Sequence, residues 1–254
     1  MSSFVIDTTA TTLSEVTAVS PPTRDTTPNY TFYSNESGTI KYGGSCSSSD
    51  TSADADNNTV TINTLSEGTY SDCKISVTDS ASNTSDNLSV STFIIDTTAP
   101  TLSEVTAVTT PSSDNTSSYT FYSNDAGTIT YGGSCSSSTS SASTGNNAIT
   151  FTALDDGTYS DCTITVTDSS GNVSSNLSVT SFTVAVPPVL GEVTAVSNPT
   201  GDNTPDYTFS SNEAGTISYG GAGGSSSSSS AISGNNTVTL TQSDNSSALS
   251  DGIY

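Results

Sequence analysis

The chain has 254 residues, of which 31% are hydrophobic, and it carries a formal net charge of −22. Only Arg24, Lys41 and Lys74 are basic, against 25 aspartates and glutamates, so the chain repels polyanions and we expect no nucleic-acid partner. No apolar run is long enough to cross a bilayer, so we also expect no membrane insertion in this segment. The acidic surplus suits cation binding, salt-rich surroundings, or simple solubility on a crowded surface.

An internal repeat runs along the chain. The heptapeptide LSEVTAV at 13–19 returns at 102–108, and it returns again as LGEVTAV at 190–196. Tyr30 and Tyr119 keep the same spacing, because they are 89 residues apart. A disordered spacer has no need to hold this register, so we expect folded repeats despite the Ser- and Thr-rich composition.

The spacing also predicts the domain boundaries. The expected parts are the end of a preceding repeat at 1–6, a first repeat at 7–95, a second at 96–184 and an incomplete third at 185–254. Phe4 aligns with Phe93 in the last strand of the first repeat, and DGIY at 251–254 corresponds to the turn before a sixth strand. We therefore expect a fragment of a longer protein. The alternative is a third repeat that borrows its missing strands from a neighbour.

Within one repeat the apolar residues alternate, which predicts strands with one buried face. In the second repeat the expected strands are, in chain order, TLSEVTAV (101–108), SYTFY (118–122), GTITY (127–131), NAITFT (147–152), CTITVT (162–167) and LSVTSFTV (177–184). Clusters of Gly, Asn, Asp and Ser separate them and supply turns. About seven short strands in a repeat of this length predict an all-β fold of two-sheet antiparallel sandwiches.

The four cysteines fit such a sandwich. Alternation along the strands places the thiols on core-facing positions, so the natural bridges are Cys46 with Cys73 and Cys135 with Cys162. Two cysteines per repeat without histidine cannot complete a tetrahedral zinc site, and the remaining alternative is free buried thiols. Closing a loop of 27 residues would stabilise the fold by roughly 3–4 kcal/mol in the chain-entropy account. A disulfide also implies an oxidising compartment, so we expect an extracellular or cell-surface protein.

Three segments carry a resemblance to a known family: IIDTTAPTLSEVTAV at 94–108, GTYSDCTITVTDSSGN at 157–172 and DNTPDYTFSSNEAGTI at 202–217. Together they resemble the tandem bacterial immunoglobulin-like repeats of large secreted and surface-anchored proteins, including adhesins. The resemblance implies immunoglobulin-like β-sandwich domains, joined with further such repeats of the same chain in a linear rod. The third repeat departs from the pattern, since TVAVPPVL at 183–190 replaces the aspartate motif and GGAGGSSSSSS at 220–230 replaces the first cysteine.

The immunoglobulin-like arrangement predicts a calcium site at the repeat boundary. Asp96 should lie between the bottom of the first repeat and the top of the second, where carboxylate and amide oxygens from several loops meet. The expected metal ligands are Asp7, Asp25, Glu67, Asp79, Asp96, Asp125 and Asp168, with Asn124 and Asn172 beside them. The alternative is that these residues are only turn formers. Calcium would neutralise their repulsion and stiffen the boundary, and Ala185 and Val186 should make the next boundary a weaker site.

No residue set in the sequence indicates an enzyme. Without histidine there is no Ser-His-Asp or Cys-His arrangement, and the pair Asp155 and Asp156 has Ser66 and Glu67 as its counterpart in the first repeat. We expect structural stalk or adhesion repeats of an extracellular bacterial surface protein whose ligand, a protein or a glycan, is unknown. The alternative is a carbohydrate- or protein-binding accessory module of a secreted enzyme, which requires an exposed aromatic platform. Repeated tyrosines such as Tyr30 are instead expected to pack in the core.

Overall fold

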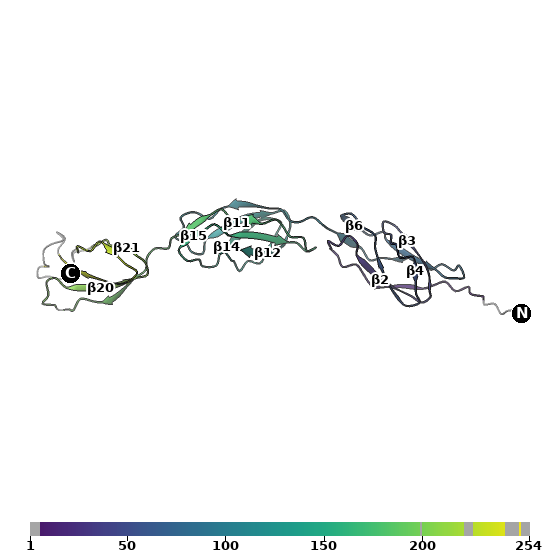
Figure 1. The fold of residues 1–254 in the computed structure, drawn as a ribbon, viewed down its shortest axis with the longest axis horizontal. Coiled ribbons are helices and arrows are strands. Elements are labelled where there is room, and N and C mark those ends of the chain that lie inside the picture. Colours follow the sequence, from purple (N-terminus) through teal and green to yellow (C-terminus); the bar gives the residue numbers. More distant parts are fainter. Residues whose placement is uncertain (1–5, 199, 221–225, 242–248, 250–254) are drawn as a thin grey trace. The chain divides into compact units, whose positions relative to one another are not determined.

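The computed structural model describes residues 6–198, 200–220, 226–241 and 249 and divides into two compact units, residues 1–184 and 185–254. The described residues form strands and loops without a helix (Figure 1), so they include none long and apolar enough to cross a membrane. Phe4 and segment 251–254, on which the expectation of a fragment rests, lie outside the described residues.

The first repeat forms nine strand segments in three antiparallel sheets. They are β1 (Leu13–Thr17), β2 (Asn29–Ser34), β3 (Gly38–Gly43), β4 (Ser52–Ala53), β5 (Asn57–Thr61), β6 (Gly68–Tyr70), β7 (Lys74–Thr78), β8 (Leu88–Ser89) and β9 (Phe93–Ile95). The sheet orders are β1-β2-β5, β4-β3-β7-β8 and β6-β9. The Val90 amide donates to the Cys73 carbonyl at 3.0 Å, so the β7-β8 and β6-β9 ladders continue one another. A parallel bridge joins Thr23 to Ile95.

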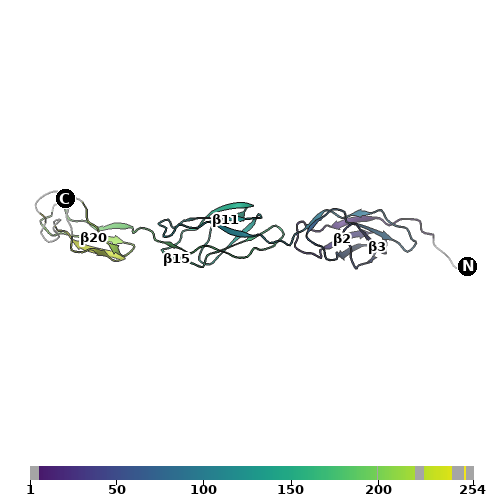
Figure 2. The same cartoon turned by 90° about the horizontal axis from the view of Figure 1, so that it is seen from above.

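The second repeat reproduces this pattern. Its strands are β10 (Leu102–Thr106), β11 (Ser118–Ser123), β12 (Gly127–Gly132), β13 (Ser141–Ala142), β14 (Gly145–Thr150), β15 (Gly157–Tyr159), β16 (Thr163–Thr167), β17 (Leu177–Ser178) and β18 (Phe182–Val184). The sheets are β10-β11-β14, β13-β12-β16-β17 and β15-β18, and Figure 2 shows β11 and β15 from a second direction. Each segment predicted as a strand in this repeat overlaps an observed strand, and LSVTSFTV (177–184) overlaps two, which confirms the all-β antiparallel prediction.

Alternating side chains from the different sheets build one core in each repeat. In the first repeat Tyr30 of β2, Val77 of β7 and Phe93 of β9 are fully buried in the same cluster. In the second repeat Tyr119 of β11 is equally buried. The repeated tyrosines therefore pack in the core, as the alternation predicts. The sheets of a repeat share this core because each contributes the apolar face of its strands.

The disulfide pairing is the predicted one. Cys46 is bonded to Cys73 and Cys135 to Cys162, and no cysteine is free. All four are buried. The first cysteine of each pair lies after β3 or β12, and the second lies directly before β7 or β16. Because β3 pairs with β7 and β12 with β16, each disulfide connects neighbouring strands of one sheet.

The described residues of the second unit form five strands. They are β19 (Leu190–Thr194), β20 (Asp206–Ser211), β21 (Gly215–Thr216), β22 (Ser230–Ala231) and β23 (Gly234–Thr239), in sheets β19-β20-β23 and β21-β22. Its buried apolar cluster consists of Phe209, Ala231 and Val238. The three-stranded sheet has the same order as β10-β11-β14, whereas β21 has two residues where β12 has six.

Candidate cation sites at the start of the first two repeats

Three carboxylates from three loops meet at the start of the second repeat. Asp96, Asp125 and Asp168 each offer an oxygen within 4.8 Å of the others. Asp96 directly follows β9, Asp125 lies in the turn between β11 and β12, and Asp168 directly follows β16. The strands bring these loops together because β11 and β16 end, and β12 begins, on the same side of the repeat. The set is a compact group of hard oxygen donors.

The same group recurs at the start of the first repeat. Asp7, Glu36 and Asp79 also offer oxygens within 4.8 Å of one another. Each stands 89 residues before its counterpart in the second repeat. The two groups occupy equivalent turns, with Glu36 between β2 and β3 and Asp79 directly after β7.

The loop that follows each final aspartate is held by that aspartate. The Asp168 carboxylate accepts hydrogen bonds from the Ser170 and Asn172 amides at 2.8 and 2.9 Å, and from the Asn172 side chain at 2.9 Å. Gly171 has φ 88°, a left-handed conformation that glycine adopts without strain. Asp168 is 7% exposed, so these donors offset much of the cost of burying its charge.

Asp79 forms the equivalent loop. Its carboxylate accepts from the Ala81 and Asn83 amides, both at 2.8 Å, and from the Asn83 side chain at 2.9 Å. The Asn83 side chain, followed by the backbone amides, holds the pKa of Asp79 below its ordinary value. Asp79 is therefore ionised at neutral pH and suited to a cation.

Asp96 contacts both repeats. Its amide donates to the Thr23 carbonyl of the first repeat at 2.9 Å. Its Oδ2 accepts from the Ser170 hydroxyl at 2.7 Å, and its carbonyl accepts from the Asn172 side chain at 3.0 Å. Arg24 of the first repeat also donates, from Nη1, to the Gly171 carbonyl at 3.1 Å. The acidic group therefore forms where the two repeats are hydrogen-bonded to each other.

Glu67 and Asp25, also predicted as ligands, belong to neither group of carboxylates among the described residues. Glu67 Oε2 accepts from the hydroxyls of Thr97 and Thr98 at 3.1 and 2.6 Å, and Thr98 followed by Thr97 lowers the pKa of Glu67. Asp25 caps a local turn, since its Oδ1 accepts from the Thr27 amide at 2.9 Å. Glu67 thus fixes the segment after Asp96, and Asp25 acts as a turn former.

Asn124 and Asn172, expected beside the carboxylates, have different roles. The Asn124 side chain accepts from the Thr101 amide at 2.7 Å, so it holds the chain entering β10. Asn172 donates to both Asp96 and Asp168. Sequence reasoning missed Glu36, although its position 89 residues before Asp125 was a signal that could have found it. At the start of the second unit, Ala185 takes the place of Asp96 and offers no side-chain oxygen.

No protein-family model matches the chain, and no curated protein matches it.

Proposed function

We propose that the chain is a structural segment of tandem immunoglobulin-like repeats from an extracellular bacterial surface protein, stiffened by calcium at the start of its repeats. The observation that carries this proposal is the recurrence, at one spacing of 89 residues, of the disulfide, the strand order and the three-carboxylate group. An active site is rarely duplicated in this way, whereas a spacer benefits from identical units and identical boundaries. The proposal assigns no catalytic role to the chain.

The strand order supports an immunoglobulin-like sandwich. The sheets β1-β2-β5 and β4-β3-β7-β8 share one core, and the chain between β1 and β2 forms a parallel bridge to the last strand. These features suit the two-sheet arrangement of that fold. The disulfide differs from that of antibody domains, which connects the two sheets, because Cys46–Cys73 ties adjacent strands of one sheet.

The disulfides and the charge support an extracellular location. All four cysteines are buried and form disulfides, and disulfides persist in oxidising compartments. The net charge of −22 favours solubility and mutual repulsion where many copies are crowded together. A stalk between an anchor and a binding tip must keep its disulfides outside the cell and must stay soluble where many copies are crowded together.

Calcium fits the acidic groups for chemical reasons. Three carboxylate oxygens in a small volume repel one another unless a cation lies among them, and calcium accepts such oxygens together with carbonyls and water in flexible geometry. The carbonyl and side chain of Asp96 both face this region through their contacts with Ser170 and Asn172. A cation held there would fix Asp96, whose amide is bonded to Thr23 of the first repeat, to the loops of the second repeat.

Calcium titration of the full chain by calorimetry tests the proposal. We expect two binding events, one for each group, with dissociation constants of about 10⁻⁴ to 10⁻³ M as in extracellular calcium modules. Asp96→Ala should remove one event and leave the other. Calcium at saturating concentration should raise the melting temperature of the first unit, because it binds the folded state only.

Asp25→Ala is the matched control, since Asp25 is an exposed aspartate of the same boundary outside both groups. It should leave both binding events unchanged. Absence of calcium-dependent heat and stabilisation in the parent chain would refute the calcium part of the proposal. The structural role is tested separately, by locating an anchor or a binding tip in the complete reading frame.

A binding module is the second candidate. Tyr33 and Tyr122, at equivalent positions of β2 and β11, are 40% and 39% exposed, and the third repeat has Ser210 there. An exposed ring is a common contact for sugars and proteins. Specific binding of the chain on a glycan array, lost in Tyr33→Ala with Tyr122→Ala, would favour this candidate over a plain spacer.

A further inference from the structure

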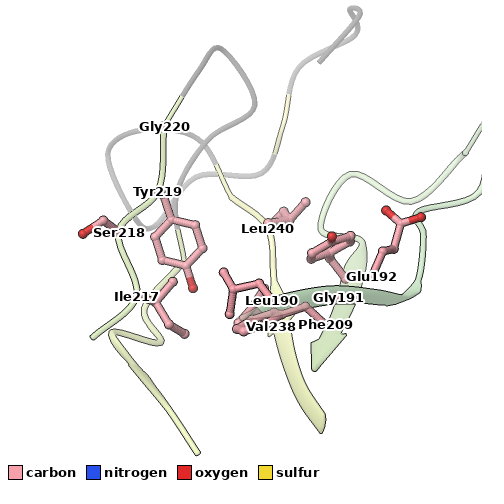
Figure 3. Close-up of a pocket in the computed structure, with 11 residues that line it drawn as sticks. Leu190, Gly191, Glu192, Phe209, Ile217, Ser218, Tyr219, Gly220, Val238 and Leu240 are labelled. Carbon is pink, nitrogen blue, oxygen red and sulfur yellow. The ribbon is translucent and has the colours of Figure 1, made fainter. Parts of the chain in front are cut away.

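The second unit has an open apolar pocket beside its shortened sheet. Its volume is about 450 Å³. Figure 3 shows Ile217 and Tyr219 on one side of the pocket and Leu190, Val238 and Leu240 on the other. Leu190 is 65% exposed, and Ile217, Tyr219 and Leu240 are half-buried. Such an apolar surface in a very polar chain indicates a place where something binds.

The second repeat shows what covers the equivalent surface. There Ile129 corresponds to Ile217 and Phe151 to Leu240, and both are buried, with 5% and 1% of their surface exposed. Strand β16 pairs with β12 and sets Val166 opposite Ile129. Phe182 of β18 stacks on Phe151 with ring centres 5.8 Å apart. The cover is therefore a pair of strands with alternating apolar side chains.

A carboxylate next to the pocket points to the same cover. In the second repeat Glu104 accepts from the amide and the hydroxyl of Thr180, at 3.0 and 2.8 Å. In the first repeat Glu15 accepts from Ser91 in the same way, at 2.9 and 2.6 Å. Glu192 lines the pocket in the same register, opposite Phe209 of β20, and has no such partner among the described residues.

The backbone edge of β21 is open as well. Strand β12 has six residues and pairs with β16 from Thr128 to Gly132. Strand β21 has two residues and pairs only with β22, so within the described part of the unit no strand adjoins the outer edge of Ile217–Gly220. Unpaired amides and carbonyls beside an apolar groove are the features that bind an added strand.

We propose that this groove is an acceptor site for an extended polypeptide segment with the pattern of Cys162–Val184, supplied from outside the described part of the second unit. Its backbone pairs with the edge at Ile217–Gly220, its alternating Ile, Val and Phe side chains fill the pocket, and a Ser or Thr donates its amide and hydroxyl to Glu192. This inference goes beyond the proposed structural role and does not depend on calcium.

The test uses the full chain and a fluorescent synthetic peptide with the sequence of residues 163–184, which contains no cysteine. We expect saturable binding of one peptide per chain by fluorescence anisotropy. Hydrogen exchange should slow at Ile217–Gly220 and stay unchanged in the first unit, whose own grooves are already filled. A peptide of scrambled sequence should not bind.

Variants of the chain locate the site. Ile217→Asp should abolish binding, because it places a charge in the groove, and Ile232→Asp is its matched control because Ile232 is 64% exposed and does not line the pocket. Glu192→Gln should weaken binding roughly tenfold, the loss expected for hydrogen bonds to a charged acceptor. Glu192 is exposed, so this variant keeps the fold.

Three results would overturn the proposal. They are no saturable binding of the peptide at millimolar concentration, binding that survives Ile217→Asp, and self-association of the chain that protects Ile217–Gly220 without peptide. The last result would show that the same groove of a second copy, and not a strand of the stated pattern, covers this surface.

Discussion

Tyr30 and Tyr119 are fully buried, and among the described residues their hydroxyls lie near Glu15 and Glu104 without a hydrogen bond of ordinary geometry. Burial, and then the nearby charge of Glu15 or Glu104, raises the pKa of each tyrosine well above its ordinary value. Each glutamate is occupied by the amide and hydroxyl of Ser91 or Thr180. Glu15 and Glu104 thus connect the first sheet of each repeat to the segment between its last two strands.

The raised pKa values predict a loss of stability at high pH. Below about pH 10 the tyrosines are neutral in both states, but above it the unfolded chain ionises first and is favoured. Tyr30→Phe with Tyr119→Phe should shift alkaline unfolding of the first unit to higher pH. At pH 7 its stability should stay within about 1 kcal/mol of the parent, because the lost hydroxyls make no hydrogen bond of ordinary geometry. Urea unfolding between pH 8 and 11.5 measures this.

Tyr33→Phe with Tyr122→Phe provides the control, since these tyrosines are exposed and their substitution removes the same number of hydroxyls without touching the core. If the two double variants unfold at the same alkaline pH, the buried tyrosines are not the cause of the loss of stability.

At the scale of elements, much of the fold could be predicted because the relevant forces are local. Alternation identifies strands such as β12 and β16, and side-chain parity identifies the disulfide between Cys135 and Cys162. The two-residue strand β13 and the three-residue strand β15 escaped prediction, the latter because its segment has the sequence of a turn. So short a strand has no period and depends on the neighbour with which it pairs.

The candidate sites were harder to predict for the same reason. Asp96 and Asp168 could be identified because each directly follows a strand with a clear pattern. Which further oxygens reach them depends on loop conformation, so Asp25 was expected in the group and Glu36 was not. Turn-forming aspartates and ligand aspartates have the same sequence signature.

Gly133 lies at a close approach between the segment after β12 and the segment before β16. It has φ 75°, and an added Cβ would lie 2.6 Å from the carbonyl carbon of Asp161. Gly133→Ala should therefore destabilise the first unit by roughly 2–4 kcal/mol, from backbone strain and from displacement of the segment before β16. Thermal unfolding followed by circular dichroism measures the loss.

Gly145→Ala separates these two causes. Gly145 has φ 110° but no atom within 4 Å of an added Cβ, so its substitution reports backbone strain alone and should cost about 1 kcal/mol. Equal losses at both glycines would show that the approach of Gly133 to Asp161 does not matter.

At the scale of the whole molecule, the charge of −22 opposes folding, because a compact chain brings like charges together. Raising sodium chloride from about 10 mM to 0.5 M shortens the Debye length to a few ångströms. We expect the melting temperature to rise by about 5 °C, which corresponds to roughly 1 kcal/mol per repeat. Differential scanning calorimetry measures the shift.

Potassium chloride should give the same increase, since screening does not distinguish the two ions. Calcium chloride at equal ionic strength should give a larger one if the carboxylate groups bind calcium. A melting temperature that does not respond to salt would show that the acidic residues are too far apart to repel one another.

Thr23 and Ile95 pair side by side in parallel, so a pull on the two ends of the first repeat loads this contact in shear. The Thr23 amide donates to Ile94 at 3.0 Å and the Asp96 amide donates to Thr23 at 2.9 Å, and both bonds must break together. Once they break, the Cys46–Cys73 bond keeps its 27-residue loop closed.

In single-molecule pulling, reduction should lengthen each unfolding step of the first two repeats by roughly 90 Å at ~3.3–3.6 Å per residue. Steps of equal length before and after reduction would contradict this. The extension of an oxidised repeat is therefore limited. Under load the repeat opens at Thr23, and its disulfide prevents the residues between the two cysteines from extending.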